Sequence, residues 1–504
     1  MYEFSDYILF AVILFSSQLI VHLVNIVVPA PFIDEIFHIG QLNHYCAGDF
    51  AYWNSKITTP PGLYVMTLFF VPMLDSVYGI QDVRSSCSLE TVRYFNSFFT
   101  AALYLISVKL MQSVHENYCS SANLKNRAMM QLTALNVTIF PLCFFYTFLY
   151  YTDVLSLFLV SWTYLLARLH YYNCSAFVGL LSCCVRQSNI VWVAFSAACA
   201  LLDQVEIIGK RNDIARPLEL VSLNQVISVL WSDFGIFKAL LCSLLSYILV
   251  GIGFVVFVYK NNGIALGDRQ AHQLSFHLVQ VAYCVVVFLV FNVAVLLPKL
   301  DIYGLLLWAK RRKMLFSMLV IGSAVSIALF TYAHPYLLAD NRHLTFYIWR
   351  RWFMAHWSAK YLLMPVYFLC LTAVHRSLEM HSFCWKILFW LTLALVTVPN
   401  RLLELRYFIT PYYMWRIHAK VQSMKTLLFE FTYSVLINCA CLILFFYKTF
   451  SWPDEQHLQL SSASFSRGSY QPNIYEDNTD ITSESRRSSA ESSKFVEQLC
   501  LLHL

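Results

Sequence analysis

Long apolar runs, separated by short polar connections, are the feature of this sequence that most restricts its fold. Of the 504 residues, 59% are hydrophobic and only 13% are charged, whereas a soluble globular chain is about a quarter charged. So much apolar surface needs lipid as its solvent, and in lipid only helices or closed barrels satisfy the backbone hydrogen-bonding groups. The runs are too long and alternate too little for barrel strands. The sequence therefore predicts an all-α polytopic membrane protein.

About twelve of these runs are predicted to cross the membrane. The first, at 7–28, has no basic leader and is long enough to span, so we expect a signal anchor that is retained. The run at 62–74 is shorter than the roughly 20 residues that a span needs, and is predicted to be a helix on the membrane surface. The remaining predicted spans are 93–113, 127–148, 152–168, 174–185, 188–203, 235–259, 274–297, 314–333, 356–375, 384–398 and 426–447.

Basic residues indicate which connections face the cytoplasm. The Lys and Arg cluster within 299–313 marks one cytoplasmic loop. Alternation then places 114–127, 203–233 and 376–386 on the same side. The opposite, luminal face receives the first loop, 29–92, and the connections 149–152, 186–187, 260–273, 334–355 and 399–425. Several arginines on that face depart from the positive-inside rule, which suggests that an anion is held there.

The end of the chain has a different composition. Residues 460–494 are rich in Ser, Asp, Glu and Arg and have little apolar content, so they cannot bury a core. We therefore predict a transmembrane domain at 1–447 and a disordered cytoplasmic tail at 448–504. The 15 Cys lie mostly inside apolar runs without metal-ligand spacing, and are interpreted as small apolar residues.

Two adjacent carboxylates, Asp34 and Glu35, follow the first predicted span. Charges this close to lipid are costly and usually have a function, although an Asp here also commonly caps the next helix. Further along the loop, aromatic and hydrogen-bonding side chains alternate, as in sites that stack and bond sugar rings. An ordinary aromatic belt at the membrane interface has the same pattern. The candidates for sugar contacts on this loop are His38, His44, Trp53, Thr59 and Tyr64.

Further short polar segments between the predicted spans lie on the same predicted face. They contribute Asp153, Arg186 and Arg406 as substrate-binding candidates. Each alone fits a structural salt bridge, so it is their convergence on one side that favours a binding site. A phosphate needs fixed Arg, Lys or His donors. The candidates for that role are Arg269, His272, Arg342 and His343.

The sequence lacks the motifs of several other function classes. It has no P-loop, no GxGxxG after a strand and no Asp-x-Asp, so a nucleotide-sugar donor and a metal site are not expected. The net charge of +6 comes from short clusters between apolar runs and does not indicate a nucleic-acid partner. A donor dissolved in the membrane needs none of these features.

Taken in order, the polar motifs resemble one family, the dolichyl-phosphate-glucose-dependent α-1,2-glucosyltransferases that add the last glucose to the lipid-linked oligosaccharide. The resemblance covers about 1–447. Its most specific string is HPYLLADNRH at 334–343, and Ser188 stands where we expect Thr. The other matching strings are DEIFHI at 34–39, ITTPPGLY at 57–64, YYTD at 150–153, RQSNI at 186–190, GDR at 267–269 and RYF at 406–408.

This resemblance implies a C-type glycosyltransferase (GT-C) membrane fold in the endoplasmic reticulum with a luminal active site. It implies dolichyl-phosphate glucose as the donor and a diglucosylated, dolichyl-diphosphate-linked oligosaccharide as the acceptor, both held in membrane lipid. It also implies inversion at the anomeric carbon, as the last step of oligosaccharide assembly for protein N-glycosylation. No cofactor and no metal are expected.

Inversion needs a base on the acceptor hydroxyl and stabilisation of the leaving phosphate. Asp34 is the predicted base, and Glu35 is either the alternative base or a group that orients the sugar. One rival reading is a multi-spanning transporter or channel-associated protein, which predicts charges near mid-membrane. Another is a binding-only membrane subunit, which predicts that loss of Asp34 is harmless.

Overall fold

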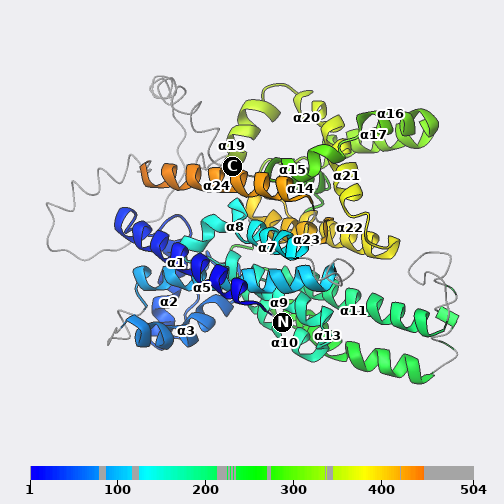
Figure 1. The fold of residues 1–504 in the computed structure, drawn as a ribbon. Coiled ribbons are helices and arrows are strands. Elements are labelled where there is room, and N and C mark those ends of the chain that lie inside the picture. Colours follow the sequence, from blue (N-terminus) through cyan, green and yellow to red (C-terminus); the bar gives the residue numbers. More distant parts are fainter. Residues whose placement is uncertain are drawn as a thin grey trace, which may run out of the picture.

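The structure is a computed structural model. It describes residues 2–78, 87–115, 124–212, 234–269, 274–334, 344–420 and 422–447, together with 224, 227–228, 231 and 337. Every element in these ranges is a helix, in agreement with the predicted all-α fold. Most of the helices run side by side as a bundle, and α2 and α3 gather near one end of it (Figure 1).

Five described helices are long and apolar enough to cross a membrane. Two further spans are possible where a pair of helices is bent, by 53° at Lys125–Thr138 with Pro141–Phe148 and by 99° at Gln280–Phe291 with Val293–Arg311. The chain is therefore a multi-pass membrane protein, but length and composition do not confirm the predicted count of twelve. The five are α1 (Phe4–Val27), α5 (Leu89–Val114), α11 (Asn189–Arg211), α13 (Phe234–Asn261) and α24 (Met424–Tyr447).

The remaining helices are shorter. Four of them, α3, α10, α17 and α22, contain apolar stretches of 10–17 residues. Their bounds are α2 (Glu35–Cys46), α3 (Gly62–Tyr78), α7 (Leu124–Thr138), α8 (Pro141–Phe144), η1 (Phe145–Phe148), α9 (Thr152–Arg168), α10 (Tyr172–Val185), α14 (Gln280–Phe291), α15 (Val293–Leu296), η2 (Leu297–Lys299), α16 (Ile302–Arg311), α17 (Lys313–Leu329), α19 (Leu344–Ile348), η3 (Trp349–Phe353), α20 (Ala359–Leu362), α21 (Met364–Ser377), α22 (Phe383–Thr397), η4 (Leu405–Phe408) and α23 (Ile409–His418).

The outer helices present apolar side chains outward, as lipid-facing helices do. In α13 only 6% of the most apolar window is buried inside the protein, and Val255 is 67% exposed. In water such a surface would drive association, whereas in a bilayer the lipid chains cover it. The amount of exposed apolar surface on α13 therefore supports a membrane environment.

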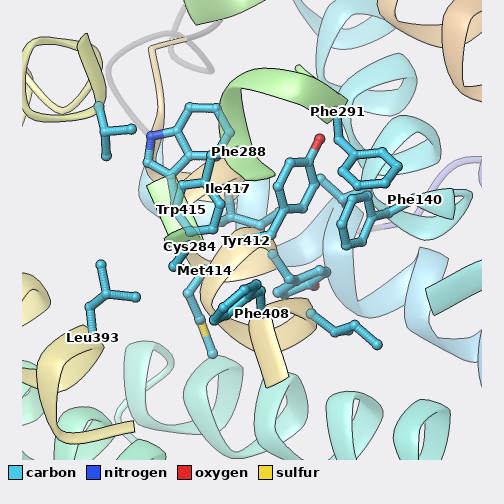
Figure 2. Packing of buried hydrophobic residues seen from close by; sticks show 14 of the residues in the cluster. Phe140, Cys284, Phe288, Phe291, Leu393, Phe408, Tyr412, Met414, Trp415 and Ile417 are labelled. Carbon is cyan, nitrogen blue, oxygen red and sulfur yellow. The ribbon is translucent and has the colours of Figure 1, made fainter. Parts of the chain in front are cut away.

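The largest buried cluster surrounds α23, whose residues are buried except for Thr410. Figure 2 shows its aromatic side chains packed against those of neighbouring helices. The ring of Tyr412 stacks on Phe140 with a centroid distance of 3.8 Å, and Trp415 stacks on Phe288 at 5.1 Å. Stacked rings of this kind stabilise a core beyond their buried area. They hold α23 in the interior of the bundle.

This inner helix connects the two ends of the bundle. Just before α23, Arg406 pairs with Asp34 on one end, which we call the Asp34 side. Just before its last residue, the carbonyl of Ile417 lies 3.0 Å from a ring nitrogen of His115, at the far end of α5. The prediction that 399–425 is a connection on a single face is therefore wrong. A helix packed wholly inside other helices does not need a continuous apolar run, so the hydrophobicity pattern did not reveal it.

The last helix, α24, ends on the Asp34 side. In its final turn the ring of Phe445 lies 5.0 Å from that of Phe32 and 5.3 Å from that of Phe145. Phe32 is two residues before Asp34. Tyr447, the last described residue of α24, therefore lies on the Asp34 side, and the tail predicted at 448–504 lies outside the described residues.

The first loop folds back on the bundle through α2 and α3. Pro60 and Pro61 precede α3, whose first residue, Gly62, lies against the backbone at the end of α10. A Cβ at Gly62 would lie 2.8 Å from the nitrogen of Val185 and closer still to the carbonyl of Cys184, so only glycine allows this approach. The predicted helix at 62–74 is thus present, and its start is fixed against α10.

A disulfide joins Cys46, at the end of α2, to Cys87, just before α5. The prediction that the cysteines are only small apolar residues is therefore wrong for this pair, whose members are 41 residues apart and are not connected by any local pattern. Disulfides form and persist in oxidising compartments, of which the endoplasmic reticulum lumen is one. Its presence on the Asp34 side therefore supports a luminal position for that side.

The end of α24 generates a topology prediction. An N-glycosylation acceptor tag placed after Leu504 should be in the same state as one inserted after Gly48 in the first loop, and both should carry glycan. The same tag inserted within 213–223, between α11 and α13, should stay unmodified. Glycan on the 213–223 tag, or different states for the first-loop and C-terminal tags, would contradict the traced path of the chain.

Candidate active site

Asp34 stands at the start of α2 with its carboxylate directed to a partly open space. Its side chain is 37% exposed, and its Oδ2 lies 3.3 Å from Nη1 of Arg406. Its backbone N–H donates to the hydroxyl of Tyr151 at 2.9 Å. The side chain forms no capping hydrogen bond to α2. The capping explanation for this residue is therefore excluded, and the carboxylate is available to a ligand.

The residue before Asp34 has an uncommon backbone conformation. Ile33 has φ of +50°, in the left-handed region that β-branched residues rarely occupy. One hydroxyl closes the turn, because Tyr151 donates to the carbonyl of Phe32 at 2.9 Å and accepts from Asp34 N–H. Conformations of this kind cost about 1–3 kcal/mol and persist only where surrounding contacts enforce them. They are concentrated at functional sites.

Glu35, the neighbour of Asp34, has a different environment. Its side chain is fully buried and accepts two hydrogen bonds from Arg93, at 3.1 and 2.7 Å. It also accepts from the backbone N–H groups of Tyr150 at 2.7 Å and Phe32 at 2.8 Å. A carboxylate has about four acceptor positions, and here all are used. The arrangement fits an anchor for the chain rather than a base or a group that binds sugar.

His38, one turn after Asp34, is almost fully buried. Its Nδ1 lies 2.7 Å from the hydroxyl of Tyr64. Burial lowers the pKa of His38 to about 4; nearby Asp34 opposes this shift, and the charges of Arg406 and Arg186 add to it. The imidazole is therefore neutral at physiological pH. A neutral ring can still donate or accept a hydrogen bond, but it does not contribute positive charge.

Arg406, on η4, bridges two carboxylates. Its Nη1 contacts Asp34, and its Nε lies 2.5 Å from Oε1 of Glu404. Burial by itself lowers the pKa of Arg406, but the charges of Glu404 and Asp34 outweigh it and raise this pKa well above its usual value. The guanidinium is 20% exposed. It is thus a permanent positive charge at the edge of the space that Asp34 faces.

A second guanidinium comes from the turn between α10 and α11. Nη1 of Arg186 lies 3.1 Å from the buried carboxylate of Asp153, and its Nε donates to the hydroxyl of Thr152 at 3.0 Å. Its side chain is 17% exposed. The sequence predicts two short runs here, 174–185 and 188–203. The first matches α10, whereas α11 continues to Arg211 and, with 23 residues, is long enough to cross a membrane.

The structure thus brings together five of the predicted site residues. The charges of Asp34, Arg406 and Arg186 all act on His38, so the four are electrostatic neighbours, and Asp153 joins them through Arg186. An accessible carboxylate can accept a proton from a hydroxyl, and two guanidinium groups can stabilise an anion. This cluster of side chains therefore has the two kinds of group that an inverting transfer from a phosphate requires.

Other predicted residues of the first loop have supporting or distant positions. Tyr64 is fully buried with its hydroxyl on His38, and the ring of Trp53 packs against it at 6.4 Å. Thr59 is half-buried in the turn before α3. His44 lies in the last turn of α2, where it stacks on Tyr52 at 3.6 Å. Because α2 rises about 1.5 Å per residue, His44 is well separated from Asp34.

Arg269 lies on a connection that is docked onto the first loop. The backbone N–H of Asp268 donates to the carbonyl of Ser55 at 2.9 Å, and Gln187 binds Thr58 O at 2.6 Å and Ile264 O at 3.0 Å. These bonds fix the connection next to the first loop. Arg269 itself is exposed, and its guanidinium donates to Asn261 at 2.7 Å. The other three phosphate candidates, His272, Arg342 and His343, lie outside the described residues.

Arg93, which holds Glu35, is not among the site residues that the sequence predicts. Its signal was present, since a charged side chain at the start of an apolar run is costly and usually functional. The predicted span at 93–113 begins with this arginine. Its partner lies 58 residues earlier in the chain, a distance that one sequence does not connect.

Comparisons with known proteins agree on one family. The family model described as the DIE2/ALG10 family matches residues 28–417, more than half of the chain. A human relative is 32% identical over 441 residues, which cover 85% of this chain and 92% of the relative. A relative from Arabidopsis thaliana is 30% identical and covers 87% and 96%, and one from Drosophila melanogaster is 31% identical and covers 83% and 91%.

All three of these relatives carry the same name, Dol-P-Glc:Glc(2)Man(9)GlcNAc(2)-PP-Dol alpha-1,2-glucosyltransferase. No solved structure matches the chain significantly. The match to the family model includes Asp34, Arg186 and Arg406.

Because Asp34 is partly exposed and Glu35 is buried, substitutions of the two carboxylates should have different effects on the stability of the protein. Glu35→Gln should lower the free energy of unfolding by about 3–5 kcal/mol, because it leaves the Arg93 charge buried without its partner. Asp34→Asn should change it by only about 0–1 kcal/mol, since a partly exposed ion pair contributes little. Thermal unfolding of the detergent-purified protein compares the two. An equal loss in both variants would contradict the structural role of Glu35.

Proposed function

The chain belongs to the DIE2/ALG10 family, and we propose that it transfers glucose from dolichyl-phosphate glucose to the diglucosylated, dolichyl-diphosphate-linked oligosaccharide. The new bond is an α-1,2 linkage, and this transfer is the last step in assembly of the oligosaccharide for protein N-glycosylation. Relatives of this name match over more than four fifths of the chain. The observation that carries the proposal is the accessible carboxylate of Asp34 beside two guanidinium groups, within the part that the family model covers.

The Asp34 side faces the lumen of the endoplasmic reticulum in this proposal. The disulfide between Cys46 and Cys87 supports it, because it needs an oxidising compartment. The all-helical architecture fits the GT-C fold that the family resemblance implies. Apolar outer faces such as that of α13 contact membrane lipid, so a donor and an acceptor with dolichyl chains reach the site from within the bilayer.

Asp34 acts as the general base. Its carboxylate takes the proton from the acceptor hydroxyl as the hydroxyl oxygen forms a bond to the anomeric carbon of the donor glucose. The bond between that carbon and the phosphate oxygen breaks on the opposite face, and its electron pair goes to the phosphate. Inversion follows from this geometry. Neutral His38 is placed to hydrogen-bond a sugar hydroxyl beside Asp34.

Arg406 and Arg186 stabilise the leaving phosphate. Arg406 contacts Asp34 at 3.3 Å, a long distance for a charge-assisted hydrogen bond. A donor phosphate offers this guanidinium a stronger partner while Glu404 keeps it in place at Nε. Binding of the donor thus frees the Asp34 oxygen for the acceptor proton.

The net charge of the side chains around Asp34 indicates that further cations take part. The carboxylates of Asp34, Asp153 and Glu404 outnumber the guanidinium groups of Arg186 and Arg406. A phosphodiester adds one more negative charge, which costs energy in a partly buried site. We therefore retain the basic residues of the later loops as donors to the phosphate; they are Arg269, His272, Arg342 and His343.

The role of Asp34 predicts a specific loss of chemistry. Asp34→Asn keeps the shape but cannot accept a proton, so transfer to a defined diglucosylated acceptor should fall by roughly 10²–10⁴-fold, while both substrates still bind. Asp49→Asn is the matched control, since Asp49 is an exposed Asp of the same loop paired with His44. Normal transfer by Asp34→Asn would show that Asp34 is not the general base, and it would favour the hypothesis that the protein is a transporter.

Substitutions of Arg406 and of Arg269 should differ in their effect on enzyme activity. Arg406→Lys loses the planar fork that reaches Asp34 and Glu404 at once, so kcat should fall by about 10²–10³-fold, as when one charge-stabilising donor is removed. Arg269→Lys, at an exposed position beside Asn261, should have the smaller effect. Steady-state kinetics with purified enzyme and dolichyl-phosphate glucose give the comparison. A larger loss for Arg269→Lys would indicate that the later loops, rather than Arg406, bind the donor phosphate.

A further inference from the structure

Arg93, near the start of α5, uses every donor of its buried guanidinium. Nε and Nη2 bind the two oxygens of Glu35 at 3.1 and 2.7 Å. Nη2 also donates to the carbonyl of Ala30 at 3.1 Å, and Nη1 donates to Val28 O at 2.7 Å and to Asn25 Oδ1 at 3.3 Å. A guanidinium has five N–H groups, and this network fills them all. Lysine, with three donors, cannot reproduce it.

These contacts fix the whole connection from α1 to α2. Arg93 holds it at Val28, at Ala30 and through Glu35, and Glu35 in turn accepts the N–H of Phe32. Asp34 lies between Phe32 and Glu35, two of the positions that this network holds. Its backbone therefore has little freedom, although its side chain is partly exposed.

The strained turn at Ile33 depends on this network. A left-handed conformation at a β-branched residue relaxes unless contacts on both sides prevent it. On both sides of Ile33 the hydroxyl of Tyr151 binds the backbone, through Phe32 O and Asp34 N–H. Beyond that turn, the Arg93–Glu35 pair holds the start of α2. The strain at Ile33 is thus retained, and it determines where the Asp34 carboxylate lies.

The other end of α2 is also joined to the beginning of α5. The disulfide connects Cys46 to Cys87, one residue before the N-cap Ser88 of α5. Near Arg93, Asn25 donates to the carbonyl of Glu90 at 2.9 Å and so adds the end of α1 to the same support. The helix that carries Asp34 is therefore attached at both ends to one membrane-spanning helix.

We propose that Arg93 is a positioning residue for Asp34: through Glu35 and the connection at 25–35, it holds the strained turn that aims the carboxylate at the acceptor. This inference rests on the proposed function, in which Asp34 is the base. It assigns to Arg93 no contact with substrate. Its effect on the reaction is transmitted only through the place of the Asp34 carboxylate.

The experiment compares two buried Arg–Glu pairs in the full-length enzyme. Arg416 binds Glu430 in the same bidentate way, at 2.9 and 2.7 Å, and both side chains are as buried as Arg93 and Glu35. Arg93→Lys and Arg416→Lys should both lower the unfolding temperature. Only Arg93→Lys should lower kcat per folded molecule, by about 10²-fold for a misplacement of ~1 Å, with little change in either KM.

A double-mutant cycle separates positioning from general loosening. If Arg93 acts through Asp34, Arg93→Lys should cause no further loss of the residual activity of Asp34→Asn. An additive loss, or a kcat per folded molecule in Arg93→Lys equal to that in Arg416→Lys, would overturn the positioning role and leave the proposed function standing. Wild-type transfer by Asp34→Asn would overturn both.

Tyr151→Phe serves if Arg93→Lys does not fold. It removes only the hydroxyl that binds Phe32 O and Asp34 N–H, and keeps the ring in place. The same inference predicts a lower kcat with an unchanged KM, and again no added loss in combination with Asp34→Asn. Unchanged kcat in Tyr151→Phe would contradict the claim that the turn positions the base.

Discussion

The buried ion pair of Arg93 and Glu35 is the interaction on which the candidate site depends. All donors of one partner and all acceptors of the other are used within the protein. Burying two charges is costly, and the cost is offset only when the geometry is good and every remaining position is bonded. That condition is met here by the Asn25 side chain of α1, by backbone groups of the α1–α2 connection and by the backbone N–H of Tyr150 before α9. The pair therefore specifies how three distant segments meet, and Asp34 is at their junction.

The cluster of charged side chains around Asp34 has more carboxylates than guanidinium groups. During the proposed transfer a proton arrives on Asp34 as one negative charge develops on the departing phosphate, so the net charge of the site does not change. Arg406 contacts Asp34 in the structure, and in the proposed transfer it contacts the phosphate. Because Glu404 holds this guanidinium from the other side, little reorganisation is needed, which is how preorganised charges lower a barrier.

Features that depend on local composition could be predicted from the sequence, whereas contacts between residues far apart in the chain could not. Runs such as α1 and α24 were recognisable because lipid exposure alone requires an apolar helix of that length. Asp34, Arg186 and Arg406 were predicted as site residues because polar groups next to membrane spans are costly, and the structure places them near one another. The role of Glu35, the disulfide of Cys46 and the path of α23 were not, because each depends on partners far along the chain. A sequence pattern indicates that a charge next to a membrane span is costly, but it does not identify the residue that this charge binds.

The most direct test of this account is an experimental structure with a non-transferable donor analogue and the diglucosylated acceptor bound. The account predicts that the acceptor hydroxyl lies within hydrogen-bonding distance of an Asp34 oxygen, on the face of the glucose opposite the phosphate. It also predicts that Arg406 contacts the phosphate while Arg93 still binds Glu35. An acceptor hydroxyl bound by another base, with Asp34 remote from the anomeric carbon, would contradict it.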